Sequence, residues 1–154
     1  APVIRIMPNI NATVLEAMSA YCCSESVTDD QKEFVNKLCS SFGKVMPLPE
    51  SYFPLFCSIA GCAPAYAYMF IDSLARSAVK NGMNKSVALE IAAQTVLGSA
   101  KKILESDEHP WELIDKVCSP GGTTIEGIVS LQKDGFESAV CNAVDAALQK
   151  DKKV

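Results

Sequence analysis

The stretch "APAYAYMFIDSLARSAVKNG", residues 63–82, predicts a helix with apolar residues on nearly every side. Pro64 suits the first turn of such a helix, and Gly82 suits the position just after its end. Asp72 and Arg76 stand four residues apart, so their side chains can form an ion pair on one face. Because a helix that is apolar nearly all round is usually covered by other elements, we expect residues 63–82 to be deeply buried.

The chain after residue 82 predicts four more helices. Within residues 85–106, one i, i+4 row consists of Ala88, Ala92, Val96, Ala100 and Leu104. Shorter helices are expected at 109–117 and 123–133, and residues 136–148 repeat apolar positions every three or four residues. No βαβ repeat follows residue 50, so the fold is predicted to be mainly α. Its apolar helix faces need a partner, most simply a second copy of the chain.

The first fifty residues indicate mixed structure. Residues 2–7 and 44–50 each predict a short strand, whereas residues 13–23 fit either a strand or a helix. Residues 28–43 predict a helix that Thr28 caps and Gly43 ends. The expected buried face of that helix consists of Phe34, Val35, Leu38 and Phe42.

The composition is typical of one globular domain. The chain has 154 residues, of which 49% are hydrophobic, and its formal net charge is -4. Its basic residues form no stripe, so we expect no nucleic-acid partner. The longest apolar run, residues 59–71, is shorter than the roughly 20 residues that cross a bilayer. No secretory leader pattern opens the chain, so we expect a soluble, cytoplasmic protein without a membrane partner.

The seven cysteines are spread along the chain, without a CxxC pair, and His109 is the single histidine. Zinc sites need cysteines and histidines at short spacings, so we expect no metal. Free thiols in a reducing cytoplasm are the expected state of the cysteines. For His109, which precedes Pro110 at a helix start, a capping or surface position is the expected role, with catalysis as the alternative.

A candidate site is the stretch "SPGGTTIEGI", residues 119–128, in which two glycines precede a helix. Residues 119–124 are named the Gly-Gly loop. The first N–H groups of a helix lack intrahelical partners and favour an anion such as a carboxylate or phosphate. Ser119, Thr123 and Thr124 add hydroxyls that both donate and accept hydrogen bonds. From these residues alone, a Pro-Gly turn followed by a threonine cap remains the alternative.

Two further stretches are weaker candidates. In "RIMPNINA", residues 5–12, Asn9 can hold an amide or a ribose of a ligand, or can simply end a strand with a turn. The small residues of "AGCAPAY", residues 60–66, allow either a flat ring or another backbone to approach closely.

Taken in order, several stretches resemble pyrroline-5-carboxylate reductase over essentially the whole chain: "RIMPN", "PAYAYMFIDSLARSAVKNG", "AAQTVLGSAKKILES", "HPWELIDKVCSPGGTTIEG" and "GFESAV". The resemblance implies a helical dimerisation domain of the 6-phosphogluconate dehydrogenase C-terminal-like type at residues 51–150. It implies a small α/β remnant of a Rossmann domain at residues 1–48. The implied activity is reduction of 1-pyrroline-5-carboxylate to L-proline with NADPH or NADH, the last step of proline biosynthesis.

The resemblance also implies roles for individual residues. The substrate carboxylate would be cradled by Ser119, Gly121, Gly122 and Thr123. Thr124 would hydrogen-bond the ring nitrogen of the substrate and act as the catalytic proton donor. The nicotinamide side would be lined by Met7, Pro8 and Asn9. The glycine-rich turn that grips the pyrophosphate in this family is absent from these residues, so we expect a part of a longer enzyme that is inactive alone.

Three stretches depart from the family pattern. Ile10-Asn11-Ala12 stands where the family usually has Thr-Pro-Ala, and Ala60-Gly61-Cys62-Ala63 stands where it has Ser-Gly-Ser-Gly. Pro54-Leu55-Phe56-Cys57 replaces a stretch that normally reads like Asp-Ala-Val-Thr. Two other functions stay open at this point, namely a helical interaction module without catalysis and the helical half of another dehydrogenase that binds a carboxylate.

Overall fold

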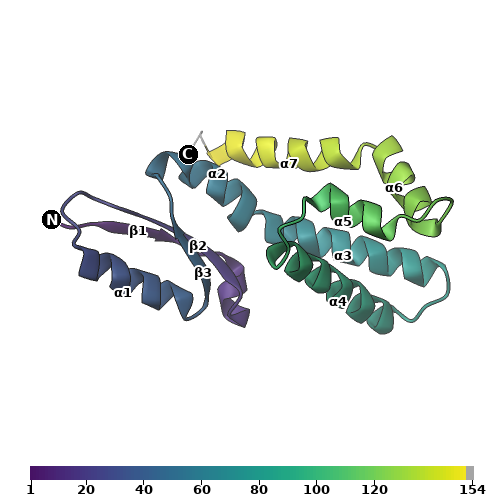
Figure 1. The fold of residues 1–154 in the computed structure, drawn as a ribbon, viewed down its shortest axis with the longest axis horizontal. Helices are drawn as coiled ribbons and strands as arrows, with labels where there is room; N and C mark the ends of the chain where they lie inside the picture. The colour runs from purple at the N-terminus through teal and green to yellow at the C-terminus, as the bar shows by residue number, and fades with distance from the viewer. Residues whose placement is uncertain (152–154) are drawn as a thin grey trace. The chain divides into compact units, whose positions relative to one another are not determined.

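The computed structural model describes residues 1–151, in which the helices predominate over one small sheet (Figure 1). Its contacts divide the chain into two compact units. One unit joins Ala1–Tyr66 to the end of the last helix from Asn142 on, and the other is Ala67–Cys141. The prediction of a mainly α fold behind a small α/β part is confirmed. The predicted domain boundary at residues 48–51 stays a prediction.

The sheet has three strands in the order β1-β2-β3, with bounds Ile4–Met7, Ala17–Cys23 and Gly43–Pro47. β1 runs antiparallel to β2, pairing Met7 with Ala20, and β3 runs parallel to β2, pairing Gly43 with Ala17. Of residues 13–23, which fitted either a strand or a helix in the sequence, Ala17–Cys23 form a strand. A 3-10 turn, Ile10–Val14, connects β1 to β2.

Helix α1, Asp29–Ser40, begins as the sequence predicts. Thr28 and Gln31 form a reciprocal capping box, in which the Thr28 hydroxyl accepts from the Gln31 N–H. The predicted buried face is only partly right, because Phe34 and Leu38 are 67% and 48% exposed. The residues that pack against Tyr21 of β2 are Val35 and Cys39, one i, i+4 row of the helix, so the sheet covers a narrower stripe than the sequence suggested.

Gly43 is needed for a different reason from the predicted one. The helix ends at Ser40 with Ser41 as its cap, and Gly43 is already the first residue of β3. Gly43 has a φ of +152°, and a Cβ there would stand 2.2 Å from the carbonyl oxygen of Ala17. The parallel pairing of β2 and β3 thus requires a residue without a side chain at this position.

A continuous helical run joins the sheet to the helical part. It begins with the 3-10 turn Glu50–Tyr52 and continues through α2, Phe53–Phe56, the π-helical turn Cys57–Gly61 (the π-turn), and α3, Ala63–Lys80. Phe53 and Phe56 are buried against Ala20 of β2. By length and composition alone, the run Glu50–Lys80 could cross a membrane, although core helices of soluble proteins pass the same test. The helix is therefore longer than the apolar run 59–71 on which the sequence argument depended.

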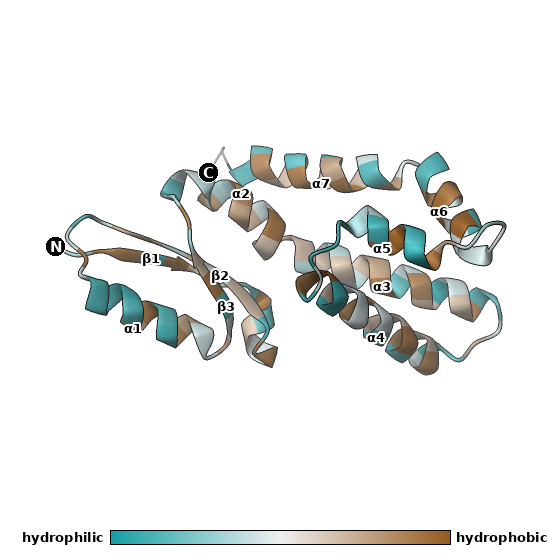
Figure 2. Cartoon of the chain, viewed as in Figure 1, coloured by the Kyte–Doolittle hydropathy of each residue, from teal (hydrophilic) through white to brown (hydrophobic). Residues whose placement is uncertain are grey.

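The prediction that residues 63–82 are deeply buried is wrong for the single chain. In α3 only Ala75 is buried, where it packs against Ala88 and Ala92 of α4, Lys85–Leu104. Large apolar side chains of α3 remain exposed, among them Tyr68 at 58% and Met69 at 69%. Hydrophobic residues recur along α3, α4 and α7, Phe136–Asp151 (Figure 2). These helices cover only a small part of one another's apolar surface.

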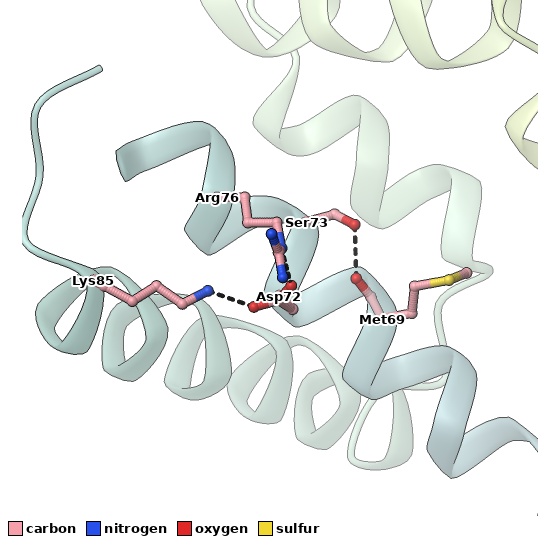
Figure 3. A network of polar contacts seen from close by, with 5 residues as sticks. All are labelled: Met69, Asp72, Ser73, Arg76 and Lys85. Carbon is pink, nitrogen blue, oxygen red and sulfur yellow. Dashed lines mark hydrogen bonds and ion pairs between the residues drawn. The ribbon is translucent and has the colours of Figure 1, made fainter. Parts of the chain in front are cut away.

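Polar contacts join α3 to α4 around one carboxylate (Figure 3). Asp72 accepts hydrogen bonds from Arg76, as the i, i+4 spacing predicted, and from Lys85 at the start of α4. These two hydrogen bonds, with Lys85 as the larger contribution, hold the pKa of Asp72 below its ordinary value. Asp72 thereby links one helix to the next.

The remaining helices are α5, Pro110–Val117, α6, Thr123–Lys133, and α7, and local contacts place α7 and α5. The Phe70 and Phe136 rings lie 6.0 Å apart between centroids, so α3 and the start of α7 pack together. His109 caps α5: its Nδ1 accepts from the Trp111 N–H at 3.2 Å, and its own N–H donates to Glu112 at 3.0 Å. The capping role expected for His109 is confirmed.

Candidate functional site

The Gly-Gly loop is a tight turn that leads directly into α6. The Gly122 N–H donates to the Ser119 carbonyl oxygen at 2.9 Å, which closes a four-residue turn. Pro120 occupies its second position and Gly121, with a φ of +68°, its third, as a type II turn requires. Nothing lies within 4 Å of a Cβ at Gly121, so this glycine serves the backbone conformation.

Gly122 serves a close approach. A Cβ there would stand 2.4 Å from Ser119 Oγ and 3.0 Å from the Ser119 carbonyl oxygen. The Ser119 side chain therefore lies directly over Gly122, at the start of α6. The two adjacent glycines fulfil different requirements, although both were expected to have the same role of removing side chains near a ligand.

The N-terminus of α6 has no side-chain cap. Its N-cap residue is Gly122, and no side-chain cap hydrogen bond is present. By contrast, side chains cap α1, α4 and α5 through Thr28, Asn84 and His109. The first N–H groups of α6 are thus free of side-chain partners and carry the positive end of the helix dipole. The alternative that a threonine caps this helix does not fit, because the N-cap is Gly122 and Thr123 is already the first residue inside the helix.

Three hydroxyl groups lie around this helix end. Ser119, Thr123 and Thr124 are all exposed in the single chain. Glu126 is the acidic residue of the first turn of α6, where a carboxylate stabilises the helix and also competes with a bound anion. The loop therefore offers backbone N–H groups and hydroxyl donors to a small anion from solvent.

The stretch Met7-Pro8-Asn9 is held in place by the Asn9 side chain. Asn9 Nδ2 donates to the carbonyl oxygen of Ala60 in the π-turn at 3.0 Å, and Asn9 Oδ1 accepts from the Met18 N–H at 3.2 Å. Met7 is half-buried against the hydrophobic cluster that contains Phe53 and Ala60, whereas Pro8 is exposed. The amide that the sequence offered to a ligand is thus engaged within the chain, and it fixes the loop between β2 and the π-turn.

The stretch 60–66, for which close packing or a flat ring was expected, contains the end of the π-turn. Single π-turns within helices often occur at functional sites. Sequence analysis missed this turn, and no apolar period in "CSIAG" signals it. The stretch Met7-Pro8-Asn9 and the Gly-Gly loop belong to different compact units.

Among the residues that the structure describes, no group of three or more His, Cys, Asp or Glu side chains could hold a metal ion. The groups that the Gly-Gly loop presents are backbone N–H groups, hydroxyls and the positive end of the α6 dipole.

Known proteins match the chain closely. The family model described as pyrroline-5-carboxylate reductase dimerisation matches residues 50–154. A pyrroline-5-carboxylate reductase of Synechocystis sp. is 40% identical over 152 residues, which are 99% of this chain and 57% of that protein.

Two solved structures share the fold. The 1-pyrroline-5-carboxylate reductase of the human pathogen Streptococcus pyogenes has a TM-score of 0.94 at 42% identity, over 99% of this chain and 59% of that one. The pyrroline carboxylate reductase of Plasmodium falciparum, with NADP bound, has a TM-score of 0.92 at 36% identity, over 99% of this chain and 61% of that one. The chain therefore spans a little over half the length of the relatives that it matches. By its match to the family model and these relatives, the chain belongs to the pyrroline-5-carboxylate reductase family, whose dimerisation domain it contains.

Proposed function

We propose that the chain is the substrate-binding and dimerising part of a reductase that converts 1-pyrroline-5-carboxylate to L-proline with a nicotinamide nucleotide. The observation that carries the proposal is the N-terminus of α6, which has no side-chain cap and is surrounded by hydroxyl groups. The substrate is an anion at neutral pH, and a helix end of this kind binds a carboxylate through backbone N–H groups. The family membership supplies the reaction.

The substrate carboxylate is proposed to lie on the Gly-Gly loop. Gly122 leaves the helix end open at its first position, and its missing side chain allows Ser119 Oγ to stay close to that end. Ser119 can then donate to the carboxylate together with the N–H groups that follow Gly122. The type II turn at Gly121 keeps these donors in one orientation.

Thr124 is proposed to donate to the substrate ring nitrogen. It is the second residue of α6, next to the proposed carboxylate position, and its side chain is exposed. The nucleotide supplies a hydride to the carbon of the C=N bond. Electron density then rises on the ring nitrogen, and a hydroxyl at hydrogen-bond distance stabilises that change and delivers a proton.

The nicotinamide side is proposed to be lined by Met7, Pro8 and Asn9. The residues fit such a role because Asn9 fixes the loop through two hydrogen bonds of its amide, while Pro8 remains exposed beside it. A rigid apolar edge of this kind suits a flat ring. A bound NADP in the Plasmodium falciparum relative supports a pyridine nucleotide as the cofactor.

The partner is proposed to be a second copy of the chain. The match to a dimerisation model covers the helical part, and α3 carries large apolar side chains that the single chain leaves exposed. Apolar helix faces of this kind are normally covered in a homodimer. The same burial accounts for the apolar composition of Glu50–Lys80 in a soluble, cytoplasmic enzyme.

The test is steady-state kinetics of Thr124→Ala in the full-length protein that contains this chain. Loss of the hydroxyl is expected to lower kcat about 10²–10⁴-fold, the usual contribution of a positioned proton donor. KM should change little, because the backbone N–H groups still meet the carboxylate. Thr123→Ala is the matched control and should be much milder, since only its backbone is used. Wild-type turnover in Thr124→Ala would refute the assignment, and a strong effect confined to Thr123→Ala would move the role by one residue.

A further inference from the structure

The π-turn places two cysteines on one side of the helical run. Cys62 donates its backbone N–H to the carbonyl oxygen of Cys57 at 3.0 Å, five residues earlier. In an α-helix, side chains three or four residues apart lie above one another, whereas in a π-turn residues five apart do so. Cys57 and Cys62 are therefore neighbours because the turn is π-helical, and an α-helical turn would separate them.

The two thiols are close enough to influence each other. After burial, the neighbouring Cys62 thiol is a further cause that raises the pKa of the Cys57 thiol. Gly61 leaves space for the Cys57 sulfur, because a Cβ at Gly61 would stand 3.3 Å from Cys57 Sγ. Both cysteines are half-buried, which lets a small molecule reach them and keeps them within the fold.

We propose that Cys57 and Cys62 form a dithiol site that low-molecular-weight disulfides oxidise to a disulfide within the helical run. A disulfide needs two Cβ atoms that are close together on one side, and the π-turn meets this condition. Cys62 is one of the positions at which the chain departs from the family pattern, and Cys57 belongs to another departing stretch.

The chemistry is thiol–disulfide exchange with a disulfide such as oxidised glutathione. The Cys62 thiolate attacks one sulfur of oxidised glutathione, a Cys62–glutathione bond forms, and one glutathione thiolate leaves. The Cys57 thiolate then attacks Cys62 Sγ, the protein disulfide forms, and the second glutathione leaves. Two protein thiols are oxidised and one small disulfide is reduced to two thiols, with two protons released from the protein.

The order of attack follows from the surroundings of the two thiols. Burial, the larger cause, and the neighbouring Cys62 raise the pKa of the Cys57 thiol, which disfavours a free thiolate there. Cys57 is therefore assigned the second, intramolecular step, in which proximity compensates for a small thiolate fraction.

Oxidation would also act on the loop at residues 7–9. The carbonyl oxygen of Ala60, which accepts from Asn9 Nδ2, lies within the ring that a disulfide between Cys57 and Cys62 would close. The redox state of the pair is therefore linked to the hydrogen bond that fixes Met7, Pro8 and Asn9, whatever that loop binds.

The experiment is incubation of the reduced chain with oxidised glutathione, followed by alkylation, trypsin digestion and mass spectrometry. Trypsin cleaves after Lys44 and Arg76, so one peptide, residues 45–76, holds Cys57 and Cys62 and no other cysteine. The exposed Cys141 reports that the oxidant has reacted. Cys22 and Cys23 are the matched control pair, because adjacent residues of β2 point to opposite sheet faces and do not pair.

We expect peptide 45–76 to lose two hydrogen atoms and two alkylation sites, while the peptide with Cys22 and Cys23 does not close a disulfide. In Cys57→Ser a glutathione should remain on Cys62, and in Cys62→Ser the remaining thiol should react slowly. The proposal is overturned if peptide 45–76 keeps both thiols while Cys141 reacts. It is equally overturned if glutathione stays on the wild-type peptide, or if the peptide is recovered only as a link between two chains.

Discussion

Ser119 Oγ lies where a side chain of Gly122 would have to be, since a Cβ at Gly122 would stand 2.4 Å from that oxygen. This contact ties the hydroxyl to the start of α6. The glycine therefore does more than permit a turn, because it determines where a donor of the proposed carboxylate site is held.

Gly122→Val is expected to raise the KM for the substrate in the full-length enzyme. The new side chain displaces Ser119 and fills the helix end, so ground-state binding weakens more than turnover does. An increase of roughly tenfold corresponds to about 1.4 kcal/mol of lost binding. The control is Gly127→Ala in the same helix, where a Cβ has nothing within 4 Å. An unchanged KM in Gly122→Val would show that the carboxylate binds elsewhere.

Gly43→Ala is expected to destabilise the sheet strongly. Its Cβ would overlap the backbone of Ala17, with the nearest atom at 2.2 Å, and backbone cannot rotate away as a side chain does. Overpacking usually costs about 1–3 kcal/mol, and the left-handed φ adds to that cost. Urea unfolding measures the loss, with Gly98→Ala in α4 as the control. That control should raise stability by about 0.5–1 kcal/mol, since nothing lies near the new Cβ.

Asn9→Asp is expected to lower stability at neutral pH, because the introduced carboxylate faces the Ala60 carbonyl oxygen where an N–H donor stood. An unsatisfied, partly buried group costs about 1–3 kcal/mol. The unfavourable contact raises the pKa of the introduced carboxyl above its unfolded value, so stability should recover as pH falls through that raised pKa. Asn9→Leu, which cannot titrate, should show no such recovery. Thermal unfolding at several pH values distinguishes the two variants. If the stability of both variants changed with pH in the same way, the assigned role of the Asn9–Ala60 hydrogen bond would be refuted.

Asp72→Asn is expected to lower stability slightly at neutral pH and to have no effect in strong acid. The pKa of Asp72 is lowered by its hydrogen bonds with Lys85 and Arg76. The stabilisation is therefore complete above the unfolded aspartate pKa and is lost as pH falls through the lowered folded pKa. Because these groups are exposed, the effect should also shrink at high salt. Thermal unfolding as a function of pH is the measurement, and a difference that persists in strong acid would contradict this origin.

Self-association is expected through the apolar face of α3. Sedimentation of the chain at micromolar concentration should show a dimer, and Met69→Glu should shift it toward monomer, because a charge would be buried in the interface. Lys44→Gln, which changes the net charge by the same amount in β3, is the control and should leave the dimer intact. A stable, folded wild-type monomer under these conditions would reject the proposal.

Much of the fold could be predicted from the sequence, for reasons that particular residues show. The capping box at Thr28 and the cap at His109 are local interactions, and local interactions leave a signal at a fixed spacing. The exposed state of Phe34 was not predicted, because periodicity locates a helix face but not how much of it the sheet covers. The exposure of α3 has a related cause, since the apolar pattern is the same whether a second element or a second chain provides the cover.

For the candidate site, the sequence predicted the loop and its helix, but not that Gly121 and Gly122 are required for different reasons. Only the folded structure shows that Gly121 is needed for its φ and Gly122 for its distance to Ser119. The engagement of Asn9 with Ala60 joins residues far apart in the sequence, and nothing in the sequence around Asn9 predicts its partner.

The π-turn also changes the angular phase of the helix that contains it. A π-turn is equivalent to the insertion of one residue into an α-helix, and one residue corresponds to about 100° of rotation. Side chains after Gly61 therefore point about 100° away from the directions that α-helical counting from Phe53 would assign. Removing a single residue from Cys57–Gly61 would leave an uninterrupted α-helix whose later side chains keep their directions, whereas an α-helix of unchanged length would turn them by about 100°. The one additional residue in the π-turn therefore sets which residues at the start of α3, up to Tyr66, share a face with those of α2.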